Sequence, residues 1–341
     1  MSITIKKIAR DLNLAVSTVS KALADSHEIS EHTKKRVLDY ASELNYVRNT
    51  YASNLKKKRT GNIAVVVPEV ADSYFSTAIN GIESVAQQKS YHVIIYITHE
   101  DQSREASIVH EFRSGRVDGV LMSVSTGKNN TTHLLELSRS NVPLVFFDRV
   151  CDDIEASKVI TDDFESGYKA TELLIRRGCK SVAFLGMAEN LSIIRDRLDG
   201  CKKAVADHGL DIEDNMIVSV GNDEQSGIES VSALLTSASR PTGVIGSTEK
   251  LATLVYVVCN QLSLKIPDDV RVIGFSNMGI ASLLSPPLTT ITQPAFEMGK
   301  AAATILFKNL ESKKHDVAIE KIVIGSVLHE RGSVENLKAH N

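Results

Sequence analysis

The sequence predicts an α/β protein that begins with a small all-helical head and continues into two lobes of parallel strands flanked by helices. Apolar residues recur at helical spacing through residues 1–46, whereas buried-type strands alternate with helical stretches from Asn62 onward. Alternation of this kind is typical of parallel sheets with right-handed crossovers. The 341 residues leave room for two or three domains, since one domain commonly takes about 100–150 residues.

The head is expected to open with two short helices and a sharp turn within residues 4–23. The first helix carries one apolar stripe at positions i, i+3, i+4 and i+7, formed by Ile5, Ile8, Ala9 and Leu12. Thr4 stands at the N-cap position, and Asn13 follows the stripe, where a residue that tolerates the left-handed conformation closes a helix. A third helix is expected after an N-cap at Ser30, with a buried stripe of Val37, Ala41 and Leu44.

The second short helix, over about residues 16–23, carries small polar side chains and one cation among its apolar residues, namely Ser17, Thr18, Ser20 and Lys21. Hydroxyl and ammonium groups on a short helix can meet base edges and phosphates in a DNA major groove. A helical pair that packs without any ligand is the alternative, because a buried stripe at i, i+3 and i+7 would take in Val16, Val19 and Leu23.

Charge is distributed unevenly along the chain. Residues 1–60 contain twelve Lys and Arg and six Asp and Glu, whereas the rest of the chain contains 27 basic and 36 acidic residues. A basic head on an acidic body favours nucleic-acid binding by the head alone, although a solvated basic face also fits. The connecting stretch 46–60 carries a basic run at 56–59, so it is either a solvated linker or a segment that folds on DNA, with a helix over 49–55.

Two successive series of strands and helices are expected in the body. The first has strands at 63–67, 93–97, 119–122 and 144–147, with helices near 76–89, 103–114 and 131–140. The second has strands at 181–185, 217–220, 243–246 and 271–274, with helices near 166–177, 196–208, 225–236 and 249–261. Residues 287–294 are expected to cross back, which places the helix near 295–311 in the first lobe. Edge strands are expected at 319–323 and 327–331.

Polar side chains follow several of the predicted strands at their carboxyl ends, where doubly wound sheets bind ligands. In the first series they lie within 72–75, at Ser123 and Ser125, and at Asp148 and Arg149. In the second series they lie within 187–197, at Thr248 and Glu249, and at Ser276 and Asn277. Hydroxyls, carboxylates and arginine at one edge fit a small polyhydroxylated or anionic ligand held by charge-assisted hydrogen bonds.

Short motifs of different kinds are distributed over nearly the whole chain. The head has T-I-x-x-I-A at 4–9, S-T-V-S at 17–20, I-S at 29–30, T-x-x-R-V-L at 33–38, L-N-Y at 44–46 and A-x-x-L at 52–55. The body has G-I-E at 81–83, V-D-G-V at 117–120, F-D-R at 147–149, R-L-D-G at 197–200, V-I-G-F at 272–275 and P-P-L-T-T-I-T-Q-P at 286–294. Together these motifs resemble the lac repressor/galactose repressor family of bacterial transcription regulators, although any single one is weak.

The resemblance implies a domain organisation. Residues 1–46 would form a helix-turn-helix DNA-binding domain, and residues 47–60 a hinge helix or linker. Residues 61–332 would form an effector-binding and dimerisation domain of the two-lobe, periplasmic-binding-protein-like (type I) architecture, with a tail at 333–341. Lobe 1 would take about 61–161 and 292–322, and lobe 2 about 162–291 and 323–332.

The same resemblance implies roles in DNA binding. The base-reading positions of the recognition helix are occupied by Val16, Ser17 and Lys21. Phosphate or positioning contacts are implied for Thr18 and Asn49, and the DNA-binding set also includes Thr4. Ala52 and Leu55 occupy hinge-helix positions that enter the minor groove. A leucine there wedges between base steps and kinks the duplex, at an unstacking cost of a few kcal/mol.

Positions for an effector also follow from the resemblance. Arg197 matches the family's effector-binding arginine, whereas a solvated arginine near a helix start would have no such role. The further effector-binding candidates are Tyr74, Phe75, Ser123, Asp148, Phe164, Thr248, Ser276 and Gln293. Of these, Phe75 and Phe164 are expected either to stack on the face of a sugar or base or to belong to the core.

Some positions depart from the family's pattern. Ser276, followed by Asn277, stands where the family often has an Asp that grips ligand hydroxyls, and Thr248 stands where Asn is common. Ala15 replaces a frequent Ser before the recognition helix, which removes a side-chain cap. The fold assignment survives these changes, but a known sugar specificity cannot be transferred to this chain.

The expected function is a sequence-specific transcriptional regulator, in the first place a repressor, that binds a near-palindromic double-stranded operator as a homodimer. A small-molecule effector between the lobes, a sugar or sugar derivative, would control its operator affinity. One alternative is a co-repressed regulator with a nucleobase-type ligand. Another is a solute-binding protein without a DNA role, against which the basic head argues. The tail has no leucine heptads that would support a tetramer.

Catalysis, cofactors and bound metals are not expected. The chain has no G-x-G-x-x-G and no P-loop, and in residues 274–279 the second Gly stands one residue too far for a nucleophile elbow. No His/Cys cluster has metal-ligand spacing, and the four cysteines are scattered, so we expect reduced thiols. With no 18-residue apolar run and no signal segment in view, we expect a cytoplasmic protein without a membrane partner.

Overall fold

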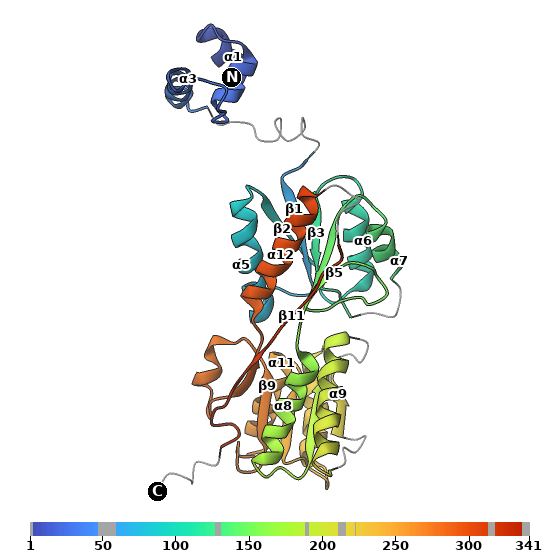
Figure 1. Cartoon of the computed structure of the whole chain (residues 1–341). Coiled ribbons are helices and arrows are strands. Elements are labelled where there is room, and N and C mark those ends of the chain that lie inside the picture. Colours follow the sequence, from blue (N-terminus) through green and yellow to red (C-terminus); the bar gives the residue numbers. More distant parts are fainter. Residues whose placement is uncertain are drawn as a thin grey trace. The chain divides into compact units, whose positions relative to one another are not determined.

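The computed structural model describes residues 3–46, 59–126, 131–187, 191–210, 216–221, 223–312 and 318–335. The chain divides into two compact units, Met1–Thr60 and Gly61–Asn341, each with its own apolar core (Figure 1). The predicted hinge residues Asn49, Ala52 and Leu55 lie outside the described residues.

The described part of the head contains three helices, as predicted: α1 (Ile5–Asp11), α2 (Val16–Ala22) and α3 (Glu31–Glu43). They enclose a small core of Ile8, Ala9, Val19, Ala22, Val37 and Ala41. Both predicted caps are present, since the hydroxyl oxygen of Thr4 accepts from the Lys7 amide at 3.4 Å and that of Ser30 from the Thr33 amide at 3.3 Å. Ala15 gives α2 no such cap, also as predicted.

The turn between α1 and α2 depends on Asn13. Its φ of 55° lies in the left-handed region, which Asn tolerates. The Asn13 amide donates to the carbonyl of Arg10 at 3.1 Å, and the Leu14 amide donates to that of Ala9 at 2.8 Å. These two bonds are those of a Schellman motif, which satisfies the last carbonyls of a helix. The predicted helix-closing role of Asn13 is therefore confirmed.

The described part of the body forms two six-stranded sheets. The first has the order β11-β5-β4-β3-β1-β2 and is parallel throughout; its strands are β1 (Asn62–Val67), β2 (His92–Ile97), β3 (Gly119–Met122), β4 (Leu144–Phe147), β5 (Ser157–Thr161) and β11 (Lys321–Ile324). The second has the order β12-β10-β9-β8-β6-β7, with only β12 antiparallel among these strands; its strands are β6 (Val182–Gly186), β7 (Ile217–Ser219), β8 (Gly243–Gly246), β9 (Arg271–Phe275), β10 (Thr289–Thr292) and β12 (Val327–His329).

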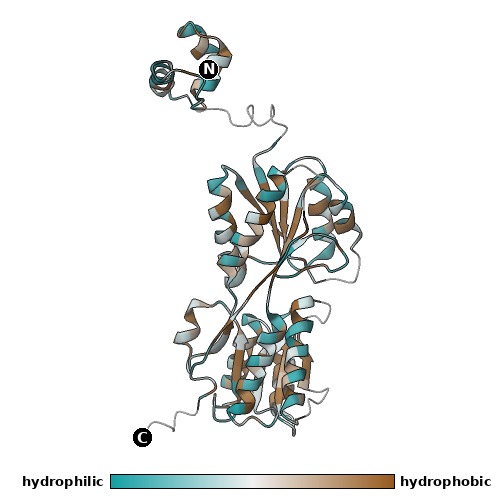
Figure 2. Ribbon diagram, in the orientation of Figure 1, coloured by the Kyte–Doolittle hydropathy of each residue, from teal (hydrophilic) through white to brown (hydrophobic). Residues whose placement is uncertain are grey.

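Helices cover both faces of each sheet. The first sheet packs between α5 (Ser73–Gln88) with α12 (Ala295–Glu311) on one face and α6 (Gln102–Phe112) with α7 (Thr132–Ser138) on the other. The second packs between α8 (Asp163–Arg176) with α9 (Ser192–Asp207) and α10 (Glu224–Thr236) with α11 (Glu249–Gln261), and a short 3-10 helix η2 (Gly279–Leu283) follows β9. Figure 2 shows apolar strands between helices whose outer faces are hydrophilic. This is the pattern of a sheet buried on both sides.

Most predicted strands and helices are found within a few residues of their predicted bounds, including the two edge strands β11 and β12. The structure adds β5 and β10, which the sequence analysis did not assign as strands. Ser, Thr or Lys occupies most positions of both, whereas the other central strands are apolar except for Asn62 and Arg271 at their first positions, so a search for apolar runs does not detect β5 and β10. Helix α12 packs on α5 and the first sheet, as predicted from a chain that crosses back after the second.

Three chain segments pass between the two sheets: β5 to α8, β10 to α12, and β11 to β12 (Figure 1). Hydrogen bonds tie the crossings to one another. The Gln293 side-chain nitrogen of the second crossing donates to Thr161 of the first at 3.4 Å, and the Ser326 backbone amide of the third donates to Asp162 of the first at 2.7 Å. Within the first crossing, the Thr161 hydroxyl donates to Asp163 at 2.8 Å. The two lobes are therefore joined by one connected bundle of strand ends.

Candidate functional site

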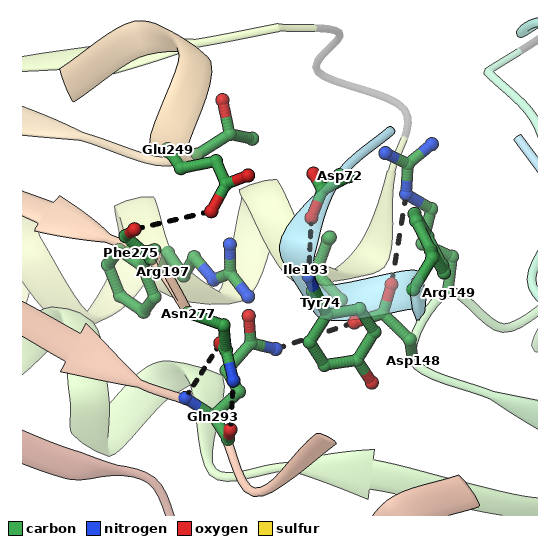
Figure 3. Close-up of a pocket in the computed structure, with 13 residues that line it drawn as sticks. Asp72, Tyr74, Asp148, Arg149, Ile193, Arg197, Glu249, Phe275, Asn277 and Gln293 are labelled. Atoms are coloured by element: carbon green, nitrogen blue, oxygen red, sulfur yellow. Dashed lines mark hydrogen bonds and ion pairs between the residues drawn. The ribbon is translucent and has the colours of Figure 1, made fainter. Parts of the chain in front are cut away.

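A cavity lies where the carboxyl ends of strands from both sheets meet. It encloses about 360 Å³ including its opening, within the usual range of about 300–1,000 Å³ for small-molecule sites. Its walls are formed by Asp72, Tyr74, Phe75, Asp148, Arg149, Ile193, Arg197, Thr248, Glu249, Phe275, Ser276, Asn277 and Gln293 (Figure 3). A wider, solvent-open mouth of about 1130 Å³ shares Asp72, Phe75, Arg149, Thr248 and Glu249 with the cavity.

Arg197 of α9 reaches into the centre of the cavity and is almost fully buried (Figure 3). Its Nε atom donates to Asp163 Oδ1 at 2.7 Å, and Nη1 donates to the Ser247 carbonyl at 2.6 Å. The guanidinium carbon lies 4.0 Å from the centre of the Phe275 ring, a geometry in which a cation is attracted by the ring. Among the described residues, Nη2 has no hydrogen-bond partner. The solvated alternative for Arg197 is thereby ruled out.

Asp148, after β4, forms the opposite wall. Its φ of 61° is a left-handed conformation, and strained backbone of this kind gathers at functional sites. Gln293 donates to its carboxylate at 3.4 Å, and the Ser123 hydroxyl donates to it at 3.5 Å. These bonds are long, and the nearest cation of an ion pair among the described residues is Arg149, whose Nε lies 3.9 Å from Asp148 Oδ2. Burial raises the pKa of Asp148 to about 6.

Asp72 caps α5 by accepting from the Tyr74 amide at 2.8 Å. Burial, together with the nearby Glu249 carboxylate, raises the pKa of Asp72 to about 6. Glu249 begins α11 in the second lobe and accepts from the Ser73 amide at 3.1 Å and from the Ser73 hydroxyl at 2.5 Å in the first. Glu249 therefore links the two lobes directly at the edge of the cavity.

The floor of the cavity comes from the loop after β9 and the crossing after β10. Asn277 donates to the Gln293 carbonyl at 2.6 Å and accepts from the Gln293 amide at 3.3 Å. The Ser276 hydroxyl donates to Glu249 at 3.3 Å. Both bonds hold the Gln293 backbone, and the Gln293 side-chain amide donates to Asp148 at 3.4 Å.

Seven of the nine predicted effector residues line the cavity: Tyr74, Phe75, Asp148, Arg197, Thr248, Ser276 and Gln293. Ser123 lines neither the cavity nor its mouth, and its hydroxyl donates to Asp148 at 3.5 Å. Phe164 is 41% exposed and lines neither the cavity nor its mouth. Phe75 is buried in the core of the first lobe and also faces the cavity, with its ring 5.2 Å from that of Tyr74 in an edge-on arrangement.

Six lining residues were not among the predicted effector residues, namely Asp72, Arg149, Ile193, Glu249, Phe275 and Asn277. All but Phe275 fall in the segments that follow predicted strands, so the strand-end rule already pointed to them. Phe275 ends β9, and its role as a platform for Arg197 depends on a contact between distant segments that no local pattern reveals.

The second helix of the head presents a mixed polar and apolar face to solvent. Val16 is 42% exposed, and Ser17 and Lys21 are exposed, whereas Val19 is fully buried. The alternative in which Val16 belongs to the buried stripe of α2 is therefore wrong. Lys21 pairs with Glu28, an exposed ion pair of little energetic weight that a phosphate can replace. Thr4 is exposed at the start of α1 and Thr18 is half-buried.

No helix within the described ranges is long and apolar enough to cross a membrane. The same residues contain no group of three or more His, Cys, Asp and Glu side chains placed to hold a metal ion.

A helical head with an exposed second helix, followed by two parallel-sheet lobes around a polar cavity, defines a class of transcription regulators that bind DNA and small molecules. Residues 4–49 match the bacterial regulatory proteins of the lacI family, and residues 171–334 match the periplasmic binding protein-like domain. The chain belongs to the lacI family of bacterial regulatory proteins and is a DNA-binding regulator of transcription.

Curated relatives support this assignment over nearly the full length. The chain is 31% identical to the HTH-type transcriptional repressor PurR of Vibrio parahaemolyticus, over 92% of this chain and 93% of the relative. It is 30% identical to the HTH-type transcriptional regulator RegA of Clostridium saccharobutylicum, over 93% and 95%. The comparison therefore covers the head as well as the body.

Solved structures show the same architecture. The lac repressor dimer bound to operator and the anti-inducer ONPF superposes with a TM-score of 0.85 at 21% identity, covering 98% of this chain and 99% of that chain. A LacI family regulator from Enterococcus faecium with bound ribose has a TM-score of 0.68 at 25% identity, covering 81% and 100%. The predicted fold class is thereby confirmed.

Proposed function

We propose that the chain represses transcription as a homodimer on a near-palindromic operator, and that a small polyhydroxylated ligand between the lobes controls its affinity for that operator. The observation that carries the effector site is the buried Arg197, which turns a donor without a partner among the described residues into the cavity. A relative named as a ribose operon repressor and the regulator with bound ribose favour a sugar-like ligand.

The proposed effector contacts are the seven predicted residues that line the cavity together with Asp72, Arg149 and Asn277. Ser123 would act through Asp148, and the exposed Phe164 is left out of this set. A ligand between the lobes makes contacts with both of them. It therefore favours the arrangement in which the lobes lie close together, which the Glu249–Ser73 bonds also favour. Coupling of this kind is typically about 1–3 kcal/mol and acts equally in both directions.

In the head, the exposed face of α2 would read bases through Val16, Ser17 and Lys21. Thr4, Thr18 and Asn49 would contact the DNA backbone and so position the head, and Ala52 and Leu55 would enter the minor groove. An exposed Val16 fits apolar contact with a thymine methyl. These proposed roles require neither a catalytic residue nor a cofactor, and we infer from them that the protein acts in the cytoplasm, where it meets DNA.

The proposal is tested by fluorescence anisotropy with a DNA fragment selected by the protein from a random library. We expect log K against log salt to fall steeply, because the basic head displaces counterions from phosphates. A ligand found by a thermal-shift screen of sugars should change the operator affinity by about 5–150-fold in one direction. A flat salt plot would contradict the DNA role, and a bound ligand without effect on DNA affinity would contradict the regulatory one.

Replacing Leu55 with Ala is expected to weaken binding to the selected operator much more than binding to a scrambled duplex of the same length. The reason is that the unstacking caused by the inserted Leu55 side chain is offset only where the bent DNA makes additional contacts with the protein. Competition binding on both duplexes measures the ratio, and Leu38→Ala serves as the control, since Leu38 is a 50% exposed leucine of the head outside the proposed interface. Equal losses on both duplexes would remove the wedge assignment.

A further inference from the structure

The charges around the cavity do not balance. The cavity and its mouth are lined by five acidic residues, namely Glu69, Asp72, Glu100, Asp148 and Glu249. The basic residues that line them are Arg149, Arg197 and Lys250, with His99 paired to Glu69 at 3.5 Å. Asp163, directly behind Arg197, adds another carboxylate. The space open to a ligand is therefore surrounded by net negative charge.

Both arginines already have carboxylate partners of their own. Arg197 Nε donates to Asp163 at 2.7 Å, with both side chains at most 5% exposed. Arg149 Nη1 donates to Glu100 at 2.7 Å; the Arg149 side chain is buried and that of Glu100 is 13% exposed. Each arginine charge is therefore offset in large part by a carboxylate of its own, and what remains of it lowers the pKa of Asp72 and Asp148 less than burial raises it. Asp72 and Asp148 have no cation at hydrogen-bonding distance among the described residues.

The hydrogen-bonding capacity of the arginines is a separate matter from their charge. Nη2 of Arg197 and Nε of Arg149 are buried donors without a hydrogen-bond partner among the described residues, and both side chains line the cavity. A buried donor left without a hydrogen-bond partner is unfavourable. A hydroxyl, ether or carbonyl oxygen would satisfy these donors without adding negative charge, while ligand hydroxyls could donate to Asp72 and Asp148.

We propose that the cavity selects a polyhydroxylated ligand without negative charge, either uncharged or bearing a protonated amine, and excludes sugar phosphates and sugar acids. This inference rests on the proposed effector role of the same cavity. It narrows the ligand class drawn from the sequence, which included anions. Asp72, Asp148 and Glu249 are the residues that would impose the exclusion, because a ligand phosphate would share the low-dielectric space with their carboxylates.

The direct test compares matched ligands by isothermal titration calorimetry on the full-length protein. The probes are ribose, glucose and glucosamine, each against its own phosphate ester, with inorganic phosphate as a further probe. We expect each ester to bind at least about tenfold more weakly than a parent that binds, a difference of about 1.4 kcal/mol. We also expect the gap to narrow in Asp72→Asn and Asp148→Asn. An ester or inorganic phosphate that binds as tightly as, or more tightly than, the parent sugars overturns the proposal.

A second test needs no ligand. Asp72 is faced by Glu249 from α11, by Asp148 after β4, and by Arg149 and Arg197, whose charges are already paired. The raised pKa of Asp72 means that its ionised form destabilises the folded protein. This destabilisation is complete when the pH is well above the folded-state pKa of about 6, and it decreases as the pH falls toward the ordinary pKa of 3.8. Asn caps a helix about as well as Asp, so Asp72→Asn keeps the α5 cap.

We therefore expect Asp72→Asn to raise the melting temperature by several degrees at about pH 8 and by clearly less at about pH 5. Asp101→Asn, which replaces the exposed cap of α6, is the matched control and should not show this gain. A lower melting temperature for Asp72→Asn at both pH values would show that the Asp72 charge is compensated, and would overturn the proposal even if no probe binds.

Failure of this inference can be told apart from failure of the proposed function. An anionic ligand that binds the cavity and alters operator affinity would leave the regulatory role intact and overturn the charge selection. An uncharged ligand that binds without any effect on operator affinity would leave the charge selection intact and contradict the regulatory role.

Discussion

Replacing Arg197 with Met is expected to lower the free energy of unfolding by about 3–5 kcal/mol and to abolish the response of operator binding to effector. The first effect has a simple origin. Asp163 is 5% exposed and would lose the cation that its Oδ1 atom contacts at 2.7 Å. The Ser247 carbonyl would also lose its donor. Urea unfolding at neutral pH measures the loss of stability.

The second effect follows from Nη2, which offers a donor to the cavity that Met cannot replace. Stability and binding can be separated with the double variant Asp163→Asn/Arg197→Met. It removes the isolated buried charge, so we expect it to recover much of the stability lost in Arg197→Met while remaining unresponsive to effector. Operator binding without effector should persist in both variants. An unchanged effector affinity in the double variant would remove Arg197 from the proposed site.

Local features of this chain were predictable because their causes are local. The caps at Thr4 and Ser30 and the left-handed Asn13 each depend on side chains within a few positions. The central strands of both sheets were predictable because a strand buried on both faces must be apolar along its length. Strands β5 and β10 were not predicted because they contain hydroxyl side chains. These hydroxyls form hydrogen bonds with Asp163 and with each other where the chain crosses between the lobes.

The site was predictable in place but not in detail. The strand-end rule located the cavity, since it depends only on the parallel topology. The partner of Arg197 could not be read from the sequence, because Asp163 stands 34 positions earlier and meets it only through the packing of α8 on α9. At the start of α8 a difference of one position separates a buried side chain from an exposed one. Asp163 is buried against Arg197, and the next residue, Phe164, is exposed.

That packing depends on glycine, and Gly167→Ala is expected to destabilise the protein by about 1–3 kcal/mol. An added Cβ at Gly167 of α8 would lie 2.1 Å from the Arg197 carbonyl oxygen of α9. At Gly200 of α9 it would lie 2.0 Å from the Phe164 carbonyl oxygen of α8. The two helices therefore touch backbone to backbone at both positions. In an unobstructed helix interior the same change would instead stabilise by up to about 1 kcal/mol.

The sign of the change is thus diagnostic, and Gly279→Ala is the matched control, because nothing lies within 4 Å of a Cβ built there. Thermal and urea unfolding of both variants should show a loss only for Gly167→Ala. Since the obstructing atom belongs to Arg197 itself, separation of the helices must displace the residue that we propose holds the effector. Effector affinity should therefore fall together with stability. A Gly167→Ala protein as stable as Gly279→Ala, with unchanged effector affinity, would mean that α9 can withdraw without moving the Arg197 guanidinium.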